Sequence, residues 1–266
     1  HLRALILNVC GSSVSNLLPG GGAVGLAATY SIAKSWGFSA ASVTTMAVVT
    51  GVWNVLARVA LPIIAVLGLA WGATDLPMAM REAAWAAVLS GTAIVVVFAL
   101  AVGTDAGARQ LGRGIDRLVR LVRRGHGDTV ESGLTGLRAR TAETVRTGWL
   151  SMTLGMVGFF GLYYVLFLLC TQTTGIELSF GQLFAAYAIG RLLTAVGVTP
   201  GGLGVTETGT AAALVAWGAD PASAMAGVVL FSIFTHFIEI PLGALGWIAW
   251  SLMPRASARE RAATEA

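Results

Sequence analysis

The sequence is built from long apolar runs separated by short polar breaks. Two runs, Ala83–Gly103 and Gly148–Thr171, contain no charged residue, and two others, Ala41–Gly72 and Ala222–Met253, are also long enough to span but include polar residues. A helix needs about 20 apolar residues to cross a bilayer. The pattern therefore predicts an all-α polytopic membrane protein.

Shorter apolar runs lie between these spans. Phe180–Val198 contains one arginine, and Leu5–Leu18 resembles the end of a span whose beginning precedes His1. Ala23–Ser35 and Leu203–Trp217 are too short for a full crossing unless they are half-membrane helices. We therefore expect about six to eight transmembrane or half-membrane helices.

Two proline-glycine strings interrupt the apolar pattern. We call Pro19-Gly20-Gly21-Gly22 the first elbow and Pro200-Gly201-Gly202-Leu203-Gly204 the second elbow; they lie 181 residues apart. The same offset aligns the string that begins at Trp36 with the string that begins at Trp217. Proline lacks a backbone donor and glycine accepts unusual dihedral angles, so neither string can continue a helix. Paired helix breaks in related halves are typical of transporter binding sites.

The charge distribution predicts an inverted arrangement of these halves. Residues 104–147 contain nine arginines and five acids, which favours a cytoplasmic location. With this segment inside, the first elbow faces outward and the second inward. We expect a first membrane repeat at residues 1–103, a basic cytoplasmic loop at 104–147, a second repeat at 148–253 and a cytoplasmic tail at 254–266.

Part of the central loop has the spacing of an amphipathic helix. Within Arg109–Arg124, the apolar residues Leu111, Ile115, Leu118 and Val122 share one face, and arginines occupy much of the rest. Such a helix favours an anionic lipid surface. An ordinary solvated linker that fixes topology is the alternative. Because the stretch has no interleaved aromatic residues and adjoins membrane spans, nucleic acid is not expected as a partner.

Composition supports a membrane protein and excludes several other classes. The chain is 56% hydrophobic and 11% charged, whereas a soluble domain is about 25% charged. The two cysteines, Cys10 and Cys170, lie in apolar runs and indicate small buried residues, not a disulfide framework. The sequence contains no Ser/His/Asp arrangement, metal-binding cluster or P-loop. No cofactor or metal is expected.

Ionisable residues within apolar runs are the candidates for function. Each costs about 2.5–3.5 kcal/mol on insertion scales and therefore needs a compensating role. Arg58 and Glu239 occupy equivalent positions at the 181-residue offset. They could pair across the interface between the repeats, and the alternatives are a structural salt bridge or separate snorkelling of the two side chains.

Three further candidates lie near the second elbow or in the last span. Arg191 is suited to a lipid phosphate, because a guanidinium binds phosphate oxygens bidentately, with snorkelling as the alternative. Glu207 could be a counter-charge for a cationic head group, a proton site or a helix cap. His236 shares a face with Glu239 and could relay a proton or simply pack. Asn54 could form hydrogen bonds between helices. The glycines of both elbows could bind phosphate through backbone donors at a helix start.

The second elbow, continued through Val205, Thr206 and Glu207 into a helix of small residues, resembles the lysylphosphatidylglycerol synthase transmembrane region, also called the flippase-like domain. The resemblance extends over the first elbow, the basic loop and the final span around Pro241. It implies a membrane domain that, in some members, is fused to an aminoacyl-transferase and moves aminoacylated phosphatidylglycerol between leaflets. This chain differs from the family pattern in two places: no acid follows the first elbow, and the last span carries His236 and Glu239 where an arginine is expected.

The sequence thus predicts a plasma-membrane lipid translocase, in a bacterium, that moves a polar phospholipid or a lipid-linked head group between leaflets by alternating access. The predicted substrate-binding residues are Pro19, Gly20, Gly21, Gly22, Arg58, Arg191, Pro200, Gly201, Gly202, Gly204, Glu207, His236 and Glu239. A soluble synthase or glycosyltransferase is a conceivable partner. The rival hypotheses are a membrane-embedded transferase, or a partner subunit of a lipid-modifying enzyme, and a scaffold whose charges only join helices.

Overall fold

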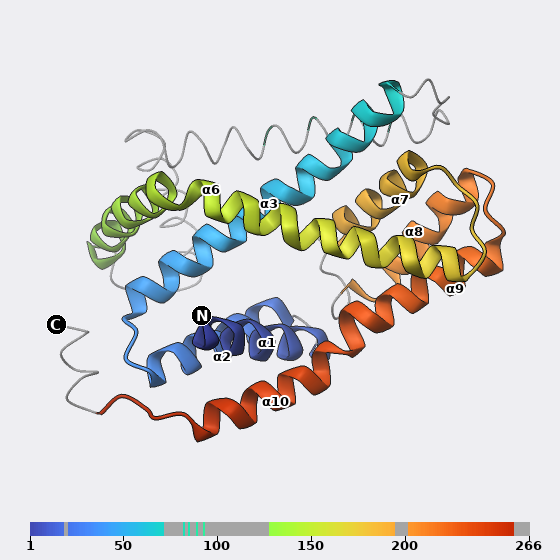
Figure 1. The fold of residues 1–266 in the computed structure, drawn as a ribbon. Helices are drawn as coiled ribbons and strands as arrows, with labels where there is room; N and C mark the ends of the chain where they lie inside the picture. The colour runs from blue at the N-terminus through green and yellow to red at the C-terminus, as the bar shows by residue number, and fades with distance from the viewer. Residues whose placement is uncertain are drawn as a thin grey trace.

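The computed structural model describes residues 1–18, 21–71, 128–194 and 202–257, together with isolated positions 82, 85, 89 and 93. All regular secondary structure within these residues is helical, which confirms the predicted all-α fold (Figure 1). The elements in chain order are α1 (Leu2–Leu17), α2 (Gly21–Ser35), α3 (Ala40–Trp71), α6 (Asp128–Thr173), α7 (Phe180–Leu193), α8 (Val205–Ala216), α9 (Pro221–Ser232), the π-helix η3 (Ile233–Phe237) and α10 (Glu239–Leu252).

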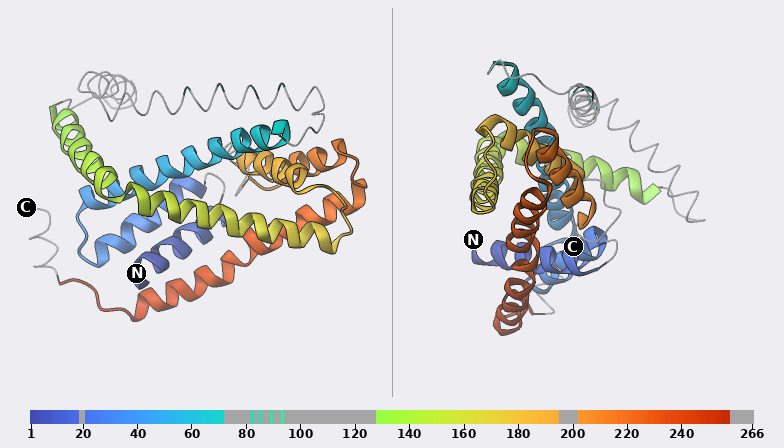
Figure 2. Two further views of the ribbon diagram at one scale, coloured as in Figure 1. Left: turned by 45° about the horizontal axis from the view of Figure 1, so that its top comes forward. Right: turned by 90° about the vertical axis from the view of Figure 1, so that its right-hand side faces the viewer.

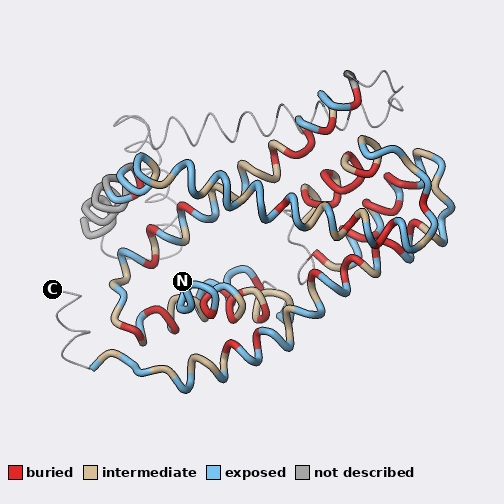
Figure 3. Tube along the Cα trace, viewed as in Figure 1, coloured by how far each residue is buried: buried red, intermediate tan, exposed pale blue. Residues whose placement is uncertain are grey.

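Three helical segments of the described residues are long and apolar enough to cross a membrane: Ala40–Leu69, Glu143–Thr173 and Pro221–Leu252. Phe180–Leu193 is a shorter apolar helix. Large apolar side chains along α6, including Leu154, Val157 and Leu162, are exposed, and much of the tube at α6 and α10 is pale blue in Figure 3. Exposed apolar side chains along such helices are expected where the surrounding solvent is lipid.

The helices form two packed groups. In the first, α1 packs against both α2 and α10, although α10 lies at the other end of the sequence (Figures 1 and 2). Ile6, Cys10 and Ile32 form the centre of this group's core. Gly243 of α10 allows the close approach, because a Cβ there would collide with the side chain of Ser13 on α1. Small residues at helix interfaces have this role in membrane proteins.

The second group contains α3, α6, α7, α8 and α9. In it α7 packs against α3 and α8, and α9 packs against α6 and α8. Its core is aromatic: Tyr187 and Phe167 are fully buried and Phe231 stacks edge-on against Phe167, with ring centroids 5.3 Å apart. The Tyr187 hydroxyl donates a hydrogen bond to the Phe160 carbonyl at 2.9 Å, which satisfies the polar atom of this buried ring.

The two halves of the chain share local hydrogen bonds at the 181-residue offset. The turn after α2 has the Phe38 amide donating to the Ala33 carbonyl, and the turn after α8 has the Ala219 amide donating to the Leu214 carbonyl. The next helices are then capped alike: Ser39 accepts from the Ser42 amide, and Asp220 accepts from the Ser223 amide. The repeated turns and caps are what a duplicated unit would give; the inverted membrane orientation stays a prediction.

Two elements differ from the sequence expectation. First, α6 begins at Asp128, so the helix extends well before the expected start of the span at Gly148. Charged residues limit the part of a helix that can lie in lipid, but the helix itself can continue beyond them. On this extension Glu143 and Arg146 form an exposed salt bridge at 3.1 Å. Second, the run Ala222–Met253 is divided by η3, in which the Ile238 amide donates to the Ile233 carbonyl. Pro241 then falls in the first turn of α10, where a missing donor is tolerated.

Candidate functional site

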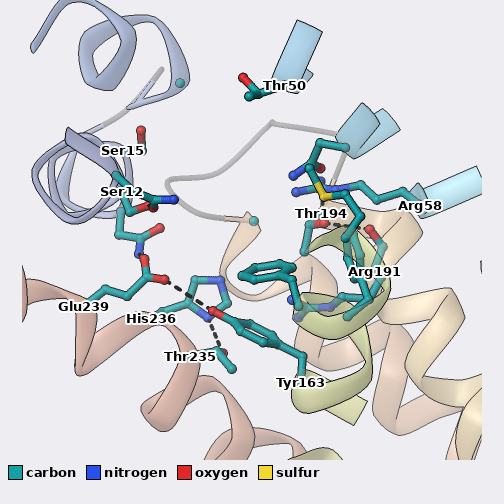
Figure 4. A pocket seen from close by; sticks show the side chains of 18 of the residues that line it. Ser12, Ser15, Thr50, Arg58, Tyr163, Arg191, Thr194, Thr235, His236 and Glu239 are labelled. Carbon is teal, nitrogen blue, oxygen red and sulfur yellow. Dashed lines mark hydrogen bonds between the residues drawn. The ribbon is translucent and has the colours of Figure 1, made fainter. Parts of the chain in front are cut away.

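A cavity of about 820 Å³ lies where the two groups of helices meet. Its wall includes residues from α1, α2, α3, α6, α7, η3 and α10, so both halves of the chain contribute (Figure 4). Arg58, Arg191 and Thr194 lie on one side, and Glu239, Ser12 and Ser15 lie on the other. We call these the cationic side and the polar side of the cavity.

Arg191 is the most unusual residue of the wall. It lies in the last turn of α7 and is only 8% exposed. Its guanidinium carbon lies 5.1 Å from the ring centre of Phe231 and 5.7 Å from those of Tyr163 and Tyr187. Within the described residues no acid forms a salt bridge with it, and its buried Nε has no hydrogen-bond partner. Aromatic faces stabilise the cation but cannot accept its N–H groups through oxygen lone pairs.

Arg58 of α3 extends the cationic side. Its Nη1 donates a 2.6 Å hydrogen bond to the Thr194 hydroxyl, which itself donates to the Arg191 carbonyl at 2.6 Å. Thr194 is the C-cap of α7, so Arg58 lies at the negative end of that helix, which favours a cation. The buried Nε of Arg58 has no partner in the described part of the chain. Both arginines therefore retain donor capacity next to the cavity.

Glu239 is the acid that the described residues place on the polar side. Its Oε2 accepts a 2.8 Å hydrogen bond from Asn16 Nδ2, and its Oε1 accepts a 3.3 Å bond from the Tyr163 hydroxyl. His236 lies one turn earlier and places Nδ1 2.9 Å from the Thr235 hydroxyl. Arg58 and Glu239 do not form the direct ion pair considered from the sequence; each has other partners, and both face the same cavity.

The second elbow is described from Gly202 onward. Gly202 lines the cavity with φ 79°, and Gly204 is the exposed N-cap of α8 with φ 88°. Glu207 caps the start of α8, because its Oε2 accepts the Gly204 amide at 2.6 Å. Its Oε1 accepts a very short hydrogen bond from the Ser232 hydroxyl. The Glu207 carboxylate thus holds the start of α8 and is not part of the cavity wall among described residues.

The cavity brings together seven residues that the sequence analysis named: Gly21, Gly22, Arg58, Arg191, Gly202, His236 and Glu239. Pro19, Gly20, Pro200 and Gly201 lie outside the described residues, as does the basic segment Arg109–Arg124.

The sequence analysis missed several residues of the wall. Asn8, Ser12 and Asn16 follow one another at helical spacing on α1 and face the cavity. Tyr163 of α6 contacts both Arg191 and Glu239. The spacing of the three polar residues within an apolar run was a usable signal, because polar side chains in membrane helices tend to face protein or water. A tyrosine in an aromatic-rich span gives no comparable signal.

Comparison with known proteins agrees with this architecture at the level of the family. No curated protein matches the chain, and no solved structure matches it. The family model described as the lysylphosphatidylglycerol synthase TM region matches residues 1–243. This match covers most of the 266 residues, including every described residue that lines the cavity. The chain therefore belongs to the lysylphosphatidylglycerol synthase TM region family.

Proposed function

We propose that this membrane protein binds the phosphate-bearing head group of a phospholipid in its central cavity and moves that lipid between leaflets. The observation that carries the proposal is Arg191: a buried guanidinium with an unpartnered Nε, at the wall of a cavity of about 820 Å³. A cation within a membrane span is costly and marks a substrate path by default.

A phosphate is the ligand that best satisfies the cationic side. Guanidinium groups bind phosphate oxygens through two parallel N–H donors, and two arginines with spare donors face the cavity. Arg58 bonds to the C-cap residue of α7, and Arg191 belongs to the last turn of the same helix. The partial negative charge at a helix C-terminus offsets only part of a full positive charge. An anionic ligand would supply the acceptors that these groups lack.

The position of the cavity supports movement of the lipid as well as binding. It lies between two groups of helices, each with its own core, so a change in their relative position would change which side of the cavity is open. The π-helix η3 joins the groups at the cavity wall, and π-helical turns often occur at functional sites. In this proposal the lipid tails stay in the bilayer, and the repeats alternate between two orientations.

Reconstitution tests the proposal. Purified protein in liposomes with a fluorescent phosphatidylglycerol should make inner-leaflet probe accessible to a membrane-impermeant quencher, and Arg191→Gln should abolish the gain. Arg255→Gln is the matched control, because Arg255 stacks on Trp250 at 4.7 Å outside the cavity wall. Equal translocation by wild type and a folded Arg191→Gln protein would contradict the proposal.

A further inference from the structure

The charged groups in and beside the cavity balance one another. Among the described residues the wall carries Arg58 and Arg191 as cations and Glu239 as its acid. The carboxylate of Glu207 acts on Arg191 electrostatically from outside the wall. With His236 neutral, the two positive and two negative charges cancel. A ligand with one net negative charge would leave that charge uncompensated, which is costly where the dielectric constant is low. A proton that binds with the ligand would restore the balance.

Glu239 is the acid that can take up such a proton from water. Glu207 lies outside the described wall, and its carboxylate holds the start of α8. The wall on the side of Glu239 is polar, because Asn8, Ser12 and Asn16 follow one another at four-residue intervals along α1. A cavity of about 820 Å³ with this lining has room for several water molecules. The polar side chains therefore give water a route along the wall to the Glu239 carboxyl.

The hydrogen bonds of Glu239 leave one of its oxygens able to receive a proton. Its Oε2 accepts from Asn16 Nδ2, a nitrogen that only donates. Its Oε1 accepts from the Tyr163 hydroxyl, and a hydroxyl can donate or accept. A proton from hydronium can therefore bind Oε1 and point at the Tyr163 oxygen, while the tyrosine turns its own hydrogen away. The step converts hydronium to water and the carboxylate to a neutral acid.

The surroundings of Glu239 link its proton to an anion in the cavity. The titratable and charged groups that the neighbouring elements bring to the same wall are His236 of η3, Tyr163 of α6, Arg191 of α7 and Arg58 of α3. The described parts of α1 and α2 add no titratable side chain to the wall. Arg191 acts on Glu239 electrostatically and favours the carboxylate. An anion bound to the two arginines opposes this effect, so ligand binding favours proton uptake.

We propose that Glu239 binds a proton together with an anionic ligand, and that the protein moves the two in the same direction across the bilayer. This inference rests on the proposed function for the anionic ligand and adds the ion that is coupled to it. Glu239 belongs to the first group of helices and Tyr163 to the second. The proton therefore changes a hydrogen bond that joins the two groups across the cavity.

Binding at different pH values tests the proposal. Dihexanoyl phosphatidylglycerol, whose phosphodiester stays anionic, would be titrated against the purified full chain in detergent between about pH 8 and about pH 5. One proton taken up per ligand changes the affinity by up to about ten-fold per pH unit. We expect the wild type to bind at least about five-fold tighter at the acid end. Glu239→Gln cannot ionise, so its affinity should change by less than about two-fold and should match or exceed that of the wild type at about pH 8.

Two further variants assign the proton to one residue. Glu177→Gln is the matched control, because Glu177 is an exposed acid outside the cavity wall, and it should keep the pH dependence of the wild type. His236→Gln should keep it as well, whatever its effect on affinity. Loss of the pH dependence in His236→Gln together with its persistence in Glu239→Gln would assign the proton to the histidine and overturn the proposal.

The wild-type protein gives an independent measurement. A pH-indicator dye in weakly buffered solution should report proton uptake when phosphatidylglycerol is added to the protein, and no uptake with detergent alone. In liposomes with a pH difference, a fluorescent phosphatidylglycerol should accumulate in the leaflet that faces the more alkaline compartment. Protein-free liposomes correct for unassisted movement, and Glu239→Gln should show no accumulation beyond theirs.

The outcomes separate this inference from the function beneath it. Phosphatidylglycerol binding with a pH-independent affinity and no proton uptake would overturn the proton site and leave the proposed function intact. Accumulation of the lipid toward the acid compartment would overturn the shared direction of movement. Failure of phosphatidylglycerol to bind the folded protein at any pH would contradict the proposed function itself, and this inference with it.

Discussion

The Tyr163 hydroxyl donates a hydrogen bond to Oε1 of Glu239 at 3.3 Å, and this bond joins the two groups of helices across the cavity. Tyr163 belongs to α6 of the second group, whereas Glu239 begins α10 of the first group. The ring of the same tyrosine lies 5.7 Å from the guanidinium carbon of Arg191. One side chain therefore contacts both the main cation and the acid of the wall.

The two contacts of Tyr163 can be separated by substitution. Tyr163→Phe keeps the ring beside Arg191 and removes the bond to Glu239, so we expect a loss of about 1 kcal/mol of stability and little change in phospholipid affinity. Tyr163→Leu also removes the aromatic face and should weaken binding more. Thermal unfolding and short-chain phosphatidylglycerol titration measure the two effects. Equal affinities for the two variants would show that the stacking on Arg191 does not matter for binding.

Glu207 is expected to act on the helix and not on the ligand. Glu207→Gln keeps the shape of the side chain that accepts the Gly204 amide but weakens this hydrogen bond, so the free energy of unfolding should fall by about 0.5–2 kcal/mol. Lipid translocation per folded molecule should stay at the wild-type rate, because the carboxylate is not part of the described cavity wall. A sharp loss of translocation in a stable Glu207→Gln protein would restore the head-group or proton role considered from the sequence.

The equivalent caps of the two halves should respond differently to pH. The Ser223 backbone amide donates to Asp220 Oδ2 at 2.9 Å and lowers the pKa of that carboxyl, whereas Ser39 caps α3 with a hydroxyl that does not titrate. Because the pKa of Asp220 is lowered in the folded state, the stabilisation that its ionised carboxylate gives to the fold is fully present above the ordinary aspartate pKa. It is lost as the pH falls through the folded-state pKa. Asp220→Ser, which copies the first half, should therefore be less stable at neutral pH. Melting curves recorded between about pH 7 and about pH 3 should show the difference in melting temperature between the wild type and Asp220→Ser becoming smaller in acid. A difference that does not change with pH would contradict the role of the Asp220 carboxylate as the cap.

The inverted orientation of the halves predicts opposite exposure of their equivalent turns. Phe38 and Asp220 lie in the turns that follow α2 and α8, and both are exposed. Cysteine substitutions at these positions should react with a membrane-impermeant reagent from opposite sides of the membrane. The native Cys10 and Cys170 are 0% and 2% exposed and should give little background. Labelling of both positions from the same side would exclude the inverted arrangement.

The sequence predicted the helices well because their signals are local. Apolar length located the three spans of the described residues, whereas the expected span Ala83–Gly103 lies almost entirely outside them. The proline-glycine strings fall between α1 and α2 and between α7 and α8. The cost of burying a charge in lipid also singled out Arg58, Arg191, His236 and Glu239, all of which line the cavity. These inferences needed only chain composition and the physics of the bilayer.

The partners of these residues could not be predicted, because they depend on packing between distant segments. Asn16 and Glu239 lie 223 residues apart in sequence and become neighbours because α1 packs against α10. The aromatic surroundings of Arg191 combine side chains from α6, α7 and α9. The role of Glu207 also depended on geometry, since a carboxylate one turn after an elbow can face either the cavity or its own helix start. Only the positions of Gly204 and Ser232 decide between the two.

The central claim is that Arg191 is retained for an anionic ligand and not for the fold. Arg191→Met removes a buried cation that has no salt bridge among the described residues and keeps an unbranched side chain against the three rings. Replacing buried charge by apolar volume is often neutral or stabilising. The decisive measurement pairs thermal unfolding of this variant with its affinity for short-chain phosphatidylglycerol. We predict an unchanged or higher melting temperature together with at least about a ten-fold loss of affinity. A destabilised variant that binds the lipid as the wild type does would contradict the account.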